Sequence, residues 1–235
     1  MNRRNKVILV EGIIGAGKSV LSQELGDALG DDTLTLMEPD EKDNANPYLS
    51  DFYADPKRWA FVMQIHLLQA RYRMHLNAQW HAMSGKGHAV LDRSYFGDTC
   101  FARLQVSTGA MTPREFGTYQ ALYHTMTSAV MLPNVCVRLL VAPEIAERRI
   151  KKRMFDRDGR RCEEVIDLGY LRDLDREISH MTSVLRQMGV TVIDMPWDID
   201  RETKEDRLTA VQSLAARIEQ EEAPDIFLDL HRRTL

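Results

Sequence analysis

Eight residues near the start of the chain have the types and the spacing that hold a phosphate. Residues 12–19 read Gly-Ile-Ile-Gly-Ala-Gly-Lys-Ser and fit the P-loop pattern G-x-x-x-x-G-K-[ST] at every fixed position. Glycines let backbone N–H groups approach phosphate oxygens, Lys18 reaches the β- and γ-phosphates, and the Ser19 hydroxyl ligates Mg²⁺. The motif predicts a nucleoside triphosphate site, with candidate binding residues Gly12, Gly15, Ala16, Gly17, Lys18 and Ser19.

Two further acidic positions stand where short apolar runs end. Glu38 follows the run 34–37, and Asp92-Arg93 follow the run 89–91. Ends of parallel strands line the ligand crevice of an open α/β sheet. A carboxylate at Glu38 could take the proton from an attacking hydroxyl, as a general base. An acid at Asp92 can hold the water shell of Mg²⁺, and Arg93 can bridge the general base and the transferring phosphoryl group. The alternatives are a solvated loop acid and a surface ion pair.

A basic cluster occupies the second half of the chain. Its members are Arg148, Arg149, Lys151, Lys152, Arg153, Arg157, Arg160 and Arg161. A charge run usually marks a solvated helix face. The alternative is a clamp in which guanidinium groups stabilise the charge that develops on a transferring phosphoryl group.

The elements that must position these groups alternate between short strands and longer helices. Apolar runs predict strands at 7–10, 34–37, 89–91, 135–141 and 190–193, and amphipathic patterns predict helices at 19–29, 57–83 and 208–218, with further starts at 112 and 143. Thr112, Pro113 and Glu115 form a capping box. This order predicts an α/β fold, a five-stranded parallel sheet with helices on both faces, in one domain (1–220) followed by a C-terminal tail (221–235).

Composition narrows the class of protein. The chain has 235 residues, of which 44% are hydrophobic and 28% charged, with a formal net charge of −4. This charge argues against a nucleic-acid binder, and no apolar run approaches the ~20 residues of a membrane span. Three cysteines without metal spacing indicate reduced thiols, so the expected location is cytoplasmic.

Several stretches taken together resemble the deoxynucleoside kinase family, from residue 6 to about residue 218. They are Glu38-Pro39, Asp92-Arg93-Ser94, the tract Asn-Pro-Tyr-Leu-Ser-Asp-Phe-Tyr at 46–53 and the tract Arg-Trp-Ala-Phe-Val-Met-Gln at 58–64. The resemblance implies a P-loop kinase fold with an arginine-rich lid at about 149–163. It also implies ATP- and Mg²⁺-dependent phosphorylation of the 5′-hydroxyl of a deoxynucleoside, in nucleotide salvage.

The resemblance also implies roles for individual residues. Glu38 becomes the catalytic base, Tyr53 contacts the sugar 3′-hydroxyl, Gln64 pairs with the base edge, and Arg71 with Asp98 forms a charged pair beside the base. Lid arginines match Arg149, Arg153 and Arg160, and Glu163 reaches the 3′-hydroxyl. An apparent insertion at 154–159 leaves the pairing of the lid arginines open.

Other questions stay open on the sequence. Purine deoxynucleosides or deoxycytidine are expected in preference to thymidine, but the preferred base is not fixed. The resemblance implies a homodimer through helices 57–83 and 113–130. Two alternatives remain, a nucleoside monophosphate kinase of the thymidylate kinase type and a non-catalytic ATP-binding regulator. The monophosphate kinase also uses an arginine lid, but Glu38 as a general base suits a neutral hydroxyl acceptor. The regulator would have no reason to keep Glu38 and a lid together.

Overall fold

The computed structural model describes residues 5–38, 46–156, 164, 166–198 and 204–222. Within these residues, five β-strands alternate with eight α-helices. The strands are β1 (Val7–Glu11), β2 (Leu34–Leu36), β3 (Ala89–Asp92), β4 (Val135–Leu140) and β5 (Thr191–Pro196). The helices are α1 (Lys18–Leu29), α2 (Leu49–Ala54), α3 (Pro56–Met83), α4 (Tyr95–Ser107), α5 (Pro113–Thr127), α6 (Pro143–Asp156), α7 (Leu168–Gln187) and α8 (Lys204–Gln220).

The strands form one parallel sheet in the order β2-β3-β1-β4-β5, which confirms the predicted five-stranded sheet. All five residues of the central strand β1 are buried, as expected of a parallel strand covered on both faces. Val10 of β1 pairs with Asp92 of β3 and with Val137 of β4. The carboxyl end of β1, from which the glycine-rich loop departs, therefore lies beside the end of β3.

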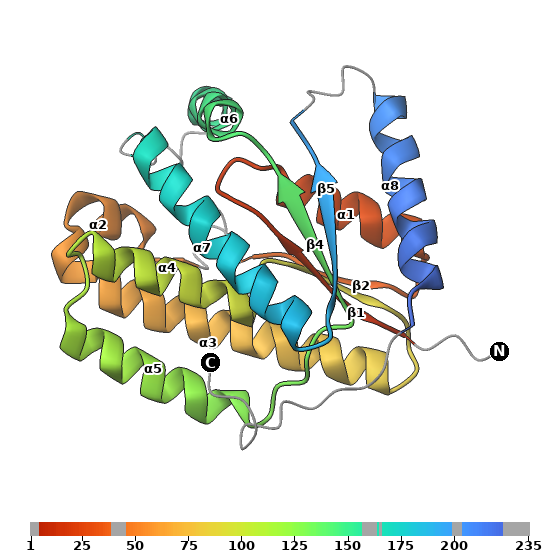
Figure 1. The fold of residues 1–235 in the computed structure, drawn as a ribbon, viewed down its shortest axis with the longest axis horizontal. Helices are drawn as coiled ribbons and strands as arrows, with labels where there is room; N and C mark the ends of the chain where they lie inside the picture. Colours follow the sequence, from red (N-terminus) through yellow and green to blue (C-terminus); the bar gives the residue numbers. More distant parts are fainter. Residues whose placement is uncertain (1–4, 39–45, 157–163, 165, 199–203, 223–235) are drawn as a thin grey trace.

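Helices cover both faces of this sheet (Figure 1). Helices α1 and α8 pack together on one face, while α3, α4 and α7 cover the other. Helix α5 lies outside this second layer and contacts α3 and α4. Helices α1, α4 and α6 each begin just after a strand, so their amino termini gather at the carboxyl edge of the sheet.

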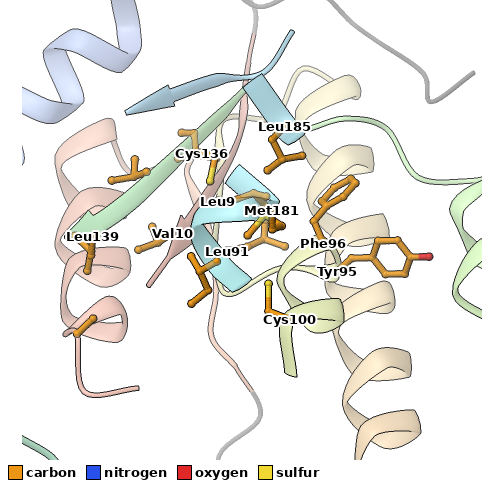
Figure 2. Close-up of a cluster of buried hydrophobic side chains, with 14 of the residues drawn as sticks. Leu9, Val10, Leu91, Tyr95, Phe96, Cys100, Cys136, Leu139, Met181 and Leu185 are labelled. Atoms are coloured by element: carbon orange, nitrogen blue, oxygen red, sulfur yellow. The ribbon is translucent and has the colours of Figure 1, made fainter. Parts of the chain in front are cut away.

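A continuous apolar core fixes the helices that approach this edge. Figure 2 shows Leu9 and Leu91 of the central strands facing Phe96 of α4 and Met181 and Leu185 of α7. Each fully buried side chain of this kind contributes about 1.5–3 kcal/mol relative to an exposed one. The core thus anchors α4 and α7, and with them the polar residues at their sheet-edge ends.

Most predicted elements were found within one to four residues of their expected bounds. Helix α3 begins at Pro56, because the Asp55 side chain accepts a hydrogen bond from the Arg58 N–H and Pro56 suits the first helical position. The capping box of Thr112 and Glu115 is present at the start of α5. Helices α2, α4 and α7 were not predicted.

The structure also bears on the cysteines and on membranes. Cys100 and Cys136 are buried free thiols, and burial raises the pKa of both; Cys162 lies outside the described residues. No helix among the described residues combines the length and the apolar character needed to cross a membrane. Over the same part of the chain, no three His, Cys, Asp or Glu side chains gather as a metal cluster would require.

Candidate active site

The glycine-rich loop joins β1 to α1 and leaves the start of that helix open to an anion. Gly15 and Gly17 adopt left-handed backbone conformations, with φ of 79° and 93°, which residues with a side chain rarely adopt. Gly17 is the N-cap of α1 and offers no capping side chain. The first N–H groups of α1 therefore stay available for a phosphate, as the motif predicts.

Lys18 lies buried within this loop. Its Nζ donates a hydrogen bond to the Ile13 carbonyl oxygen at 2.9 Å, which holds the side chain over the loop. Burial lowers the Lys18 pKa to about 7, and the positive charge of Arg93 adds to the effect. A bound anion would favour the charged form of Lys18 and so oppose both effects on its pKa. The site therefore favours a negatively charged ligand.

Helix α6 packs directly on the same loop. A Cβ at Gly15 would lie 2.6 Å from the Ala146 carbonyl oxygen, which only glycine permits. From the next turn of α6, Arg149 donates to the carbonyl oxygens of Ala16 at 3.3 Å and Trp197 at 3.0 Å. Arg149 thus lies against the loop in which the phosphates are expected.

The two predicted magnesium residues are in contact. The Ser19 hydroxyl donates to Asp92 Oδ2 at 2.5 Å. The other carboxylate oxygen, Asp92 Oδ1, is buried and has no hydrogen-bond partner among the described residues. A hydroxyl beside a carboxylate with spare acceptor capacity is the oxygen donor set that Mg²⁺ prefers.

Glu38 lies between two arginines at the end of β2. Arg93 Nε donates to Glu38 Oε2 at 2.8 Å, and Arg71 donates to Glu38 Oε1. Burial alone would raise the pKa of Glu38, but Arg93 and Arg71 outweigh it and lower the pKa to about 2. The carboxylate is therefore ionised and fixed in orientation at neutral pH.

Arg93 adopts a left-handed backbone conformation, with φ of 69°. This conformation is uncommon for a residue with a side chain and costs of the order of 1 kcal/mol. The guanidinium group lies over the Phe101 ring, 4.6 Å from its centroid, and also donates to the Gly12 carbonyl oxygen at 3.4 Å. The turn after β3 thereby directs a cation back across the loop.

Behind Glu38, Arg71 continues into a second buried pair. Arg71 donates to Asp98, which is fully buried and also accepts from the Tyr119 hydroxyl at 2.6 Å and from Gln64 Nε2 at 2.8 Å. Burial raises the pKa of Asp98, and Arg71 opposes this shift. Glu38, Arg71, Asp98 and Gln64 thus form one connected network, because each side chain contacts the next.

A cavity of about 360 Å³ opens over these groups. The predicted site residues that line it are Gly15, Lys18, Ser19, Glu38, Tyr53, Gln64, Arg71, Asp92, Arg93 and Arg153. Its remaining wall is largely apolar or aromatic and includes Phe52, Met63 and Phe101. A concave site in which charged and polar side chains converge opposite an apolar and aromatic wall suits a small polar molecule that carries an apolar ring.

The other predicted site residues are absent from the lining of this cavity. Gly12, Ala16 and Gly17 form the loop beside the cavity, and Asp98 lies beneath its surface. Arg149 faces the loop. Arg160 and Glu163 lie outside the described residues, as does Pro39 of the Glu38-Pro39 pair.

Sequence reasoning missed several residues that the structure brings to the site. Phe101 and Gln105 line the cavity, as does Tyr170, and Trp197 lies against Gly17 of the loop. A signal for two of them was present. Positions 98, 101 and 105 follow the i, i+3, i+7 spacing of one helix face, which places Phe101 and Gln105 on the side of α4 that carries Asp98.

Comparison with known proteins gives consistent matches. The sequence profile of the deoxynucleoside kinase family matches residues 8–216. A deoxyguanosine kinase of Dictyostelium discoideum is 35% identical over 198 residues, covering 84% of this chain and 66% of the relative. A deoxyadenosine kinase of the same organism is 35% identical over 167 residues, covering 71% and 62%. The chain therefore spans just under two thirds of the length of these relatives.

The fold is also similar to solved structures. The structure of deoxyadenosine kinase from M. mycoides with bound dATP has a TM-score of 0.70 and 25% sequence identity to this chain. The match covers 88% of this chain and 98% of that chain. The parallel sheet and its helical layers are therefore those of a P-loop kinase.

Proposed function

The chain belongs to the deoxynucleoside kinase family, and we propose that it transfers the γ-phosphoryl group of ATP to the 5′-hydroxyl of a deoxynucleoside. The observation that carries this proposal is one cavity lined both by Lys18 and Ser19 of the phosphate loop and by Glu38. A phosphate donor and a hydroxyl acceptor can therefore meet in the same space.

Glu38 is proposed to orient the attacking hydroxyl and accept its proton. The carboxylate is ionised and held by Arg71 and Arg93, so it can accept a hydrogen bond from the 5′-hydroxyl in a fixed direction. A pKa of about 2 makes it a weak base. This suits a loose phosphoryl-transfer transition state, in which positioning of the hydroxyl matters more than early proton removal.

Lys18, Arg93 and the lid arginines are proposed to stabilise the transferring group. Lys18 holds the β- and γ-phosphates, and Arg93 spans the distance between Glu38 and the loop. Arg153 lines the cavity from α6. We propose that Arg149, Arg153 and Arg160 close over the phosphates as a lid at 149–163, and that Glu163 reaches the sugar.

Ser19 and Asp92 fit Mg²⁺, given the contact between them and the unpartnered Asp92 Oδ1. A bound Mg²⁺ would neutralise phosphate charge as the phosphoryl group moves. Within this proposal, Ser19 ligates the ion directly and Asp92 holds its water shell.

The preferred substrates are proposed to be purine deoxynucleosides or deoxycytidine rather than thymidine, for nucleotide salvage. The buried pair of Arg71 and Asp98 supports this preference, because a desolvated ion pair is a poor neighbour for the thymine methyl group. Tyr53 is proposed at the sugar 3′-hydroxyl and Gln64 at the base edge. A cytoplasmic location stays a prediction from the cysteines.

We also propose a homodimer through α3 and α5, which contact each other along one side of the molecule. Large apolar side chains are exposed on both helices, namely Val62, Trp80, Met83 and Leu122. Burial of exposed apolar side chains favours association. Light scattering coupled to gel filtration would measure the mass of the particle.

The test is ADP release from ATP and Mg²⁺ in the presence of each of the four natural deoxynucleosides or of their 5′-monophosphates. The Lys18→Ala variant is the matched blank, because it removes the β/γ-phosphate contact and should abolish the signal. Release with a deoxynucleoside, and none with its monophosphate, is the expected result.

Two other outcomes would replace the proposal. Release with monophosphates alone would identify a nucleoside monophosphate kinase. ATP binding without release for any acceptor would identify a non-catalytic regulator. Full activity of Lys18→Ala would contradict the assignment of the phosphate loop.

A further inference from the structure

Gln105, a residue of the cavity wall, carries a buried side-chain carbonyl oxygen that has no hydrogen-bond partner among the described residues. Its side chain lines the cavity and is only 4% exposed. The amide oxygen Oε1 is shielded from solvent and has no hydrogen-bond partner among the described residues. A buried acceptor without a donor costs about 1–3 kcal/mol, so such atoms usually serve a ligand or an ordered water.

The orientation of this amide is fixed by its neighbours. Gln64 Nε2 donates to the Asp98 backbone carbonyl oxygen at 3.1 Å, and a carbonyl oxygen can only accept. The NH₂ group of Gln64 must therefore face Asp98, so Gln64 Oε1 faces Gln105. Gln105 Nε2 donates to that oxygen at 2.9 Å, which leaves Gln105 Oε1 as the remaining acceptor.

The position of Gln105 along α4 suits the base of a nucleoside. The Arg93 guanidinium, which holds Glu38, lies over Phe101 of α4. Gln105 follows Phe101 by one helical turn, about 6 Å further along the axis. A substrate with its 5′-hydroxyl at Glu38 would extend its base along this face of the helix. Among the described residues that line the cavity, Asp92 and Gln105 each carry a buried acceptor without a partner; Asp92 lies at the phosphate end, and Gln105 lies toward the expected place of the base.

We propose that Gln105 Oε1 accepts a hydrogen bond from the exocyclic amino group of the substrate's base, and so makes Gln105 a specificity-determining residue. Adenine and cytosine carry such a group on the ring carbon where thymine presents a carbonyl oxygen, whereas guanine carries its amino group on C2. Two facing acceptors repel and leave both oxygens without a donor. This inference rests on the proposed kinase function and adds the chemical group by which the substrate is recognised.

The test compares substrates that differ only in the amino group. The pairs are deoxyadenosine with purine 2′-deoxyribonucleoside, deoxycytidine with 2-pyrimidinone 2′-deoxyribonucleoside, and deoxyguanosine with deoxyinosine. For the natural substrate that wild-type protein uses best, loss of the amino group should lower kcat/KM about 10- to 100-fold.

The Gln105→Met variant then locates the effect. Methionine matches the length of glutamine but has no acceptor, so the amino-group factor should fall to about twofold or less. Gln64 also loses its donor in this variant, but its NH₂ group stays on Asp98, which keeps its orientation. Leu67→Met, on the same cavity wall, is the control and should keep the wild-type factor.

Each outcome decides the inference. A wild-type protein that uses both members of its best pair equally well overturns it without any variant. An amino-group factor that is unchanged in Gln105→Met also overturns it, and would assign the selection to other groups or to a bound water. Wild-type protein that phosphorylates no deoxynucleoside would instead reject the proposed function, which separates the two failures.

Discussion

Two parts of helix α3, residues 56–71 and residues 72–83, bury polar side chains in contrasting ways. The first part directs Gln64 and Arg71 toward the cavity, where Arg71 lies between the carboxylates of Glu38 and Asp98. The second part carries His75 and Gln79, which contact the backbone of the segment before β4. His75 Nε2 lies 2.8 Å from the Met131 carbonyl oxygen, and Gln79 Nε2 donates to the Ala129 carbonyl oxygen at 2.9 Å.

The difference indicates why each part of α3 carries its buried polar residues. Neutral hydrogen bonds to backbone hold a loop in place at modest desolvation cost. A buried charged network is expensive to desolvate, and replacing one with apolar side chains is often neutral or stabilising. The charges around Arg71 are therefore better explained by a ligand than by stability, whereas His75 and Gln79 are explained by the fold. Five predictions test this contrast and the site beside it.

The largest expected effect comes from Glu38→Gln. This change keeps the shape of the side chain and one acceptor for the arginines, but removes the charge and the proton acceptor. Turnover should fall on the order of 10²–10⁴-fold, while deoxynucleoside binding measured by calorimetry without ATP stays nearly normal. Turnover within a few-fold of wild type would show that Glu38 is not the base.

Breaking the charged pair behind Glu38 should cost stability as well as activity. Arg71→Met leaves Asp98 buried without its counter-ion, so denaturant unfolding should show a loss of about 3–5 kcal/mol. Arg71→Met combined with Asp98→Ala removes both charges and should lose less. A double variant that is less stable than Arg71→Met alone would indicate that the network contributes stability through its other hydrogen bonds.

The same double variant also reads out base choice. Removing both side chains opens space for the thymine methyl group, so thymidine use should rise relative to deoxyadenosine. An unchanged ratio, or a wild-type preference for thymidine, would contradict the role of this pair in selection.

The proposed lid arginines Arg149 and Arg153 provide the next test. Arg149→Ala and Arg153→Ala should each lower turnover about 10²–10³-fold, with little change in deoxynucleoside affinity, because charge develops on the phosphoryl group in the transition state. Arg148→Ala on the same helix is the control. Wild-type turnover in all three variants would indicate that these arginines only form a solvated helix face.

The smallest effect is expected from protonation of His75, in the part of α3 whose buried polar side chains are neutral. Burial lowers the His75 pKa to about 4, and the hydrogen bond to Met131 opposes this only in part. Between pH 6.5 and 4 the unfolded chain binds the proton that the folded protein excludes. The free energy of unfolding should therefore fall as pH drops through this window, by at most roughly 3 kcal/mol.

His75→Gln should flatten that dependence, since glutamine does not titrate and its amide can still donate to the Met131 carbonyl oxygen. Unfolding by urea at several pH values would measure it. Wild type and variant with the same slope would assign the acid sensitivity to other groups.

Features with fixed local spacing were predictable from the sequence. The loop at 12–19, the acid ending β2 and the Asp92-Arg93 pair ending β3 rely on motif order and on the rule that parallel strand ends share one edge. Their convergence on one cavity follows from the strand order, which places β1 beside β3.

What was missed depends on packing between helices distant in sequence. Tyr119 reaches Asp98 only because α5 packs against α4, and no spacing within either helix announces that contact. Helix α7 is different, since its apolar residues at 171, 174, 178, 181 and 185 follow a helical period. Helix α7 could therefore have been predicted from the sequence, whereas the hydrogen bond from Tyr119 to Asp98 could not.

The close approach of Gly15 to Ala146 has a consequence for variation among relatives and for engineering. The α6 backbone lies directly against the loop at Ala146, so any side chain at position 15 would push the first turns of α6 outward. Arg149 and Arg153 would move with it. Substitutions at position 15 and in the first turns of α6 should therefore covary in an alignment, and a designer who wants to retune donor choice must alter both segments together.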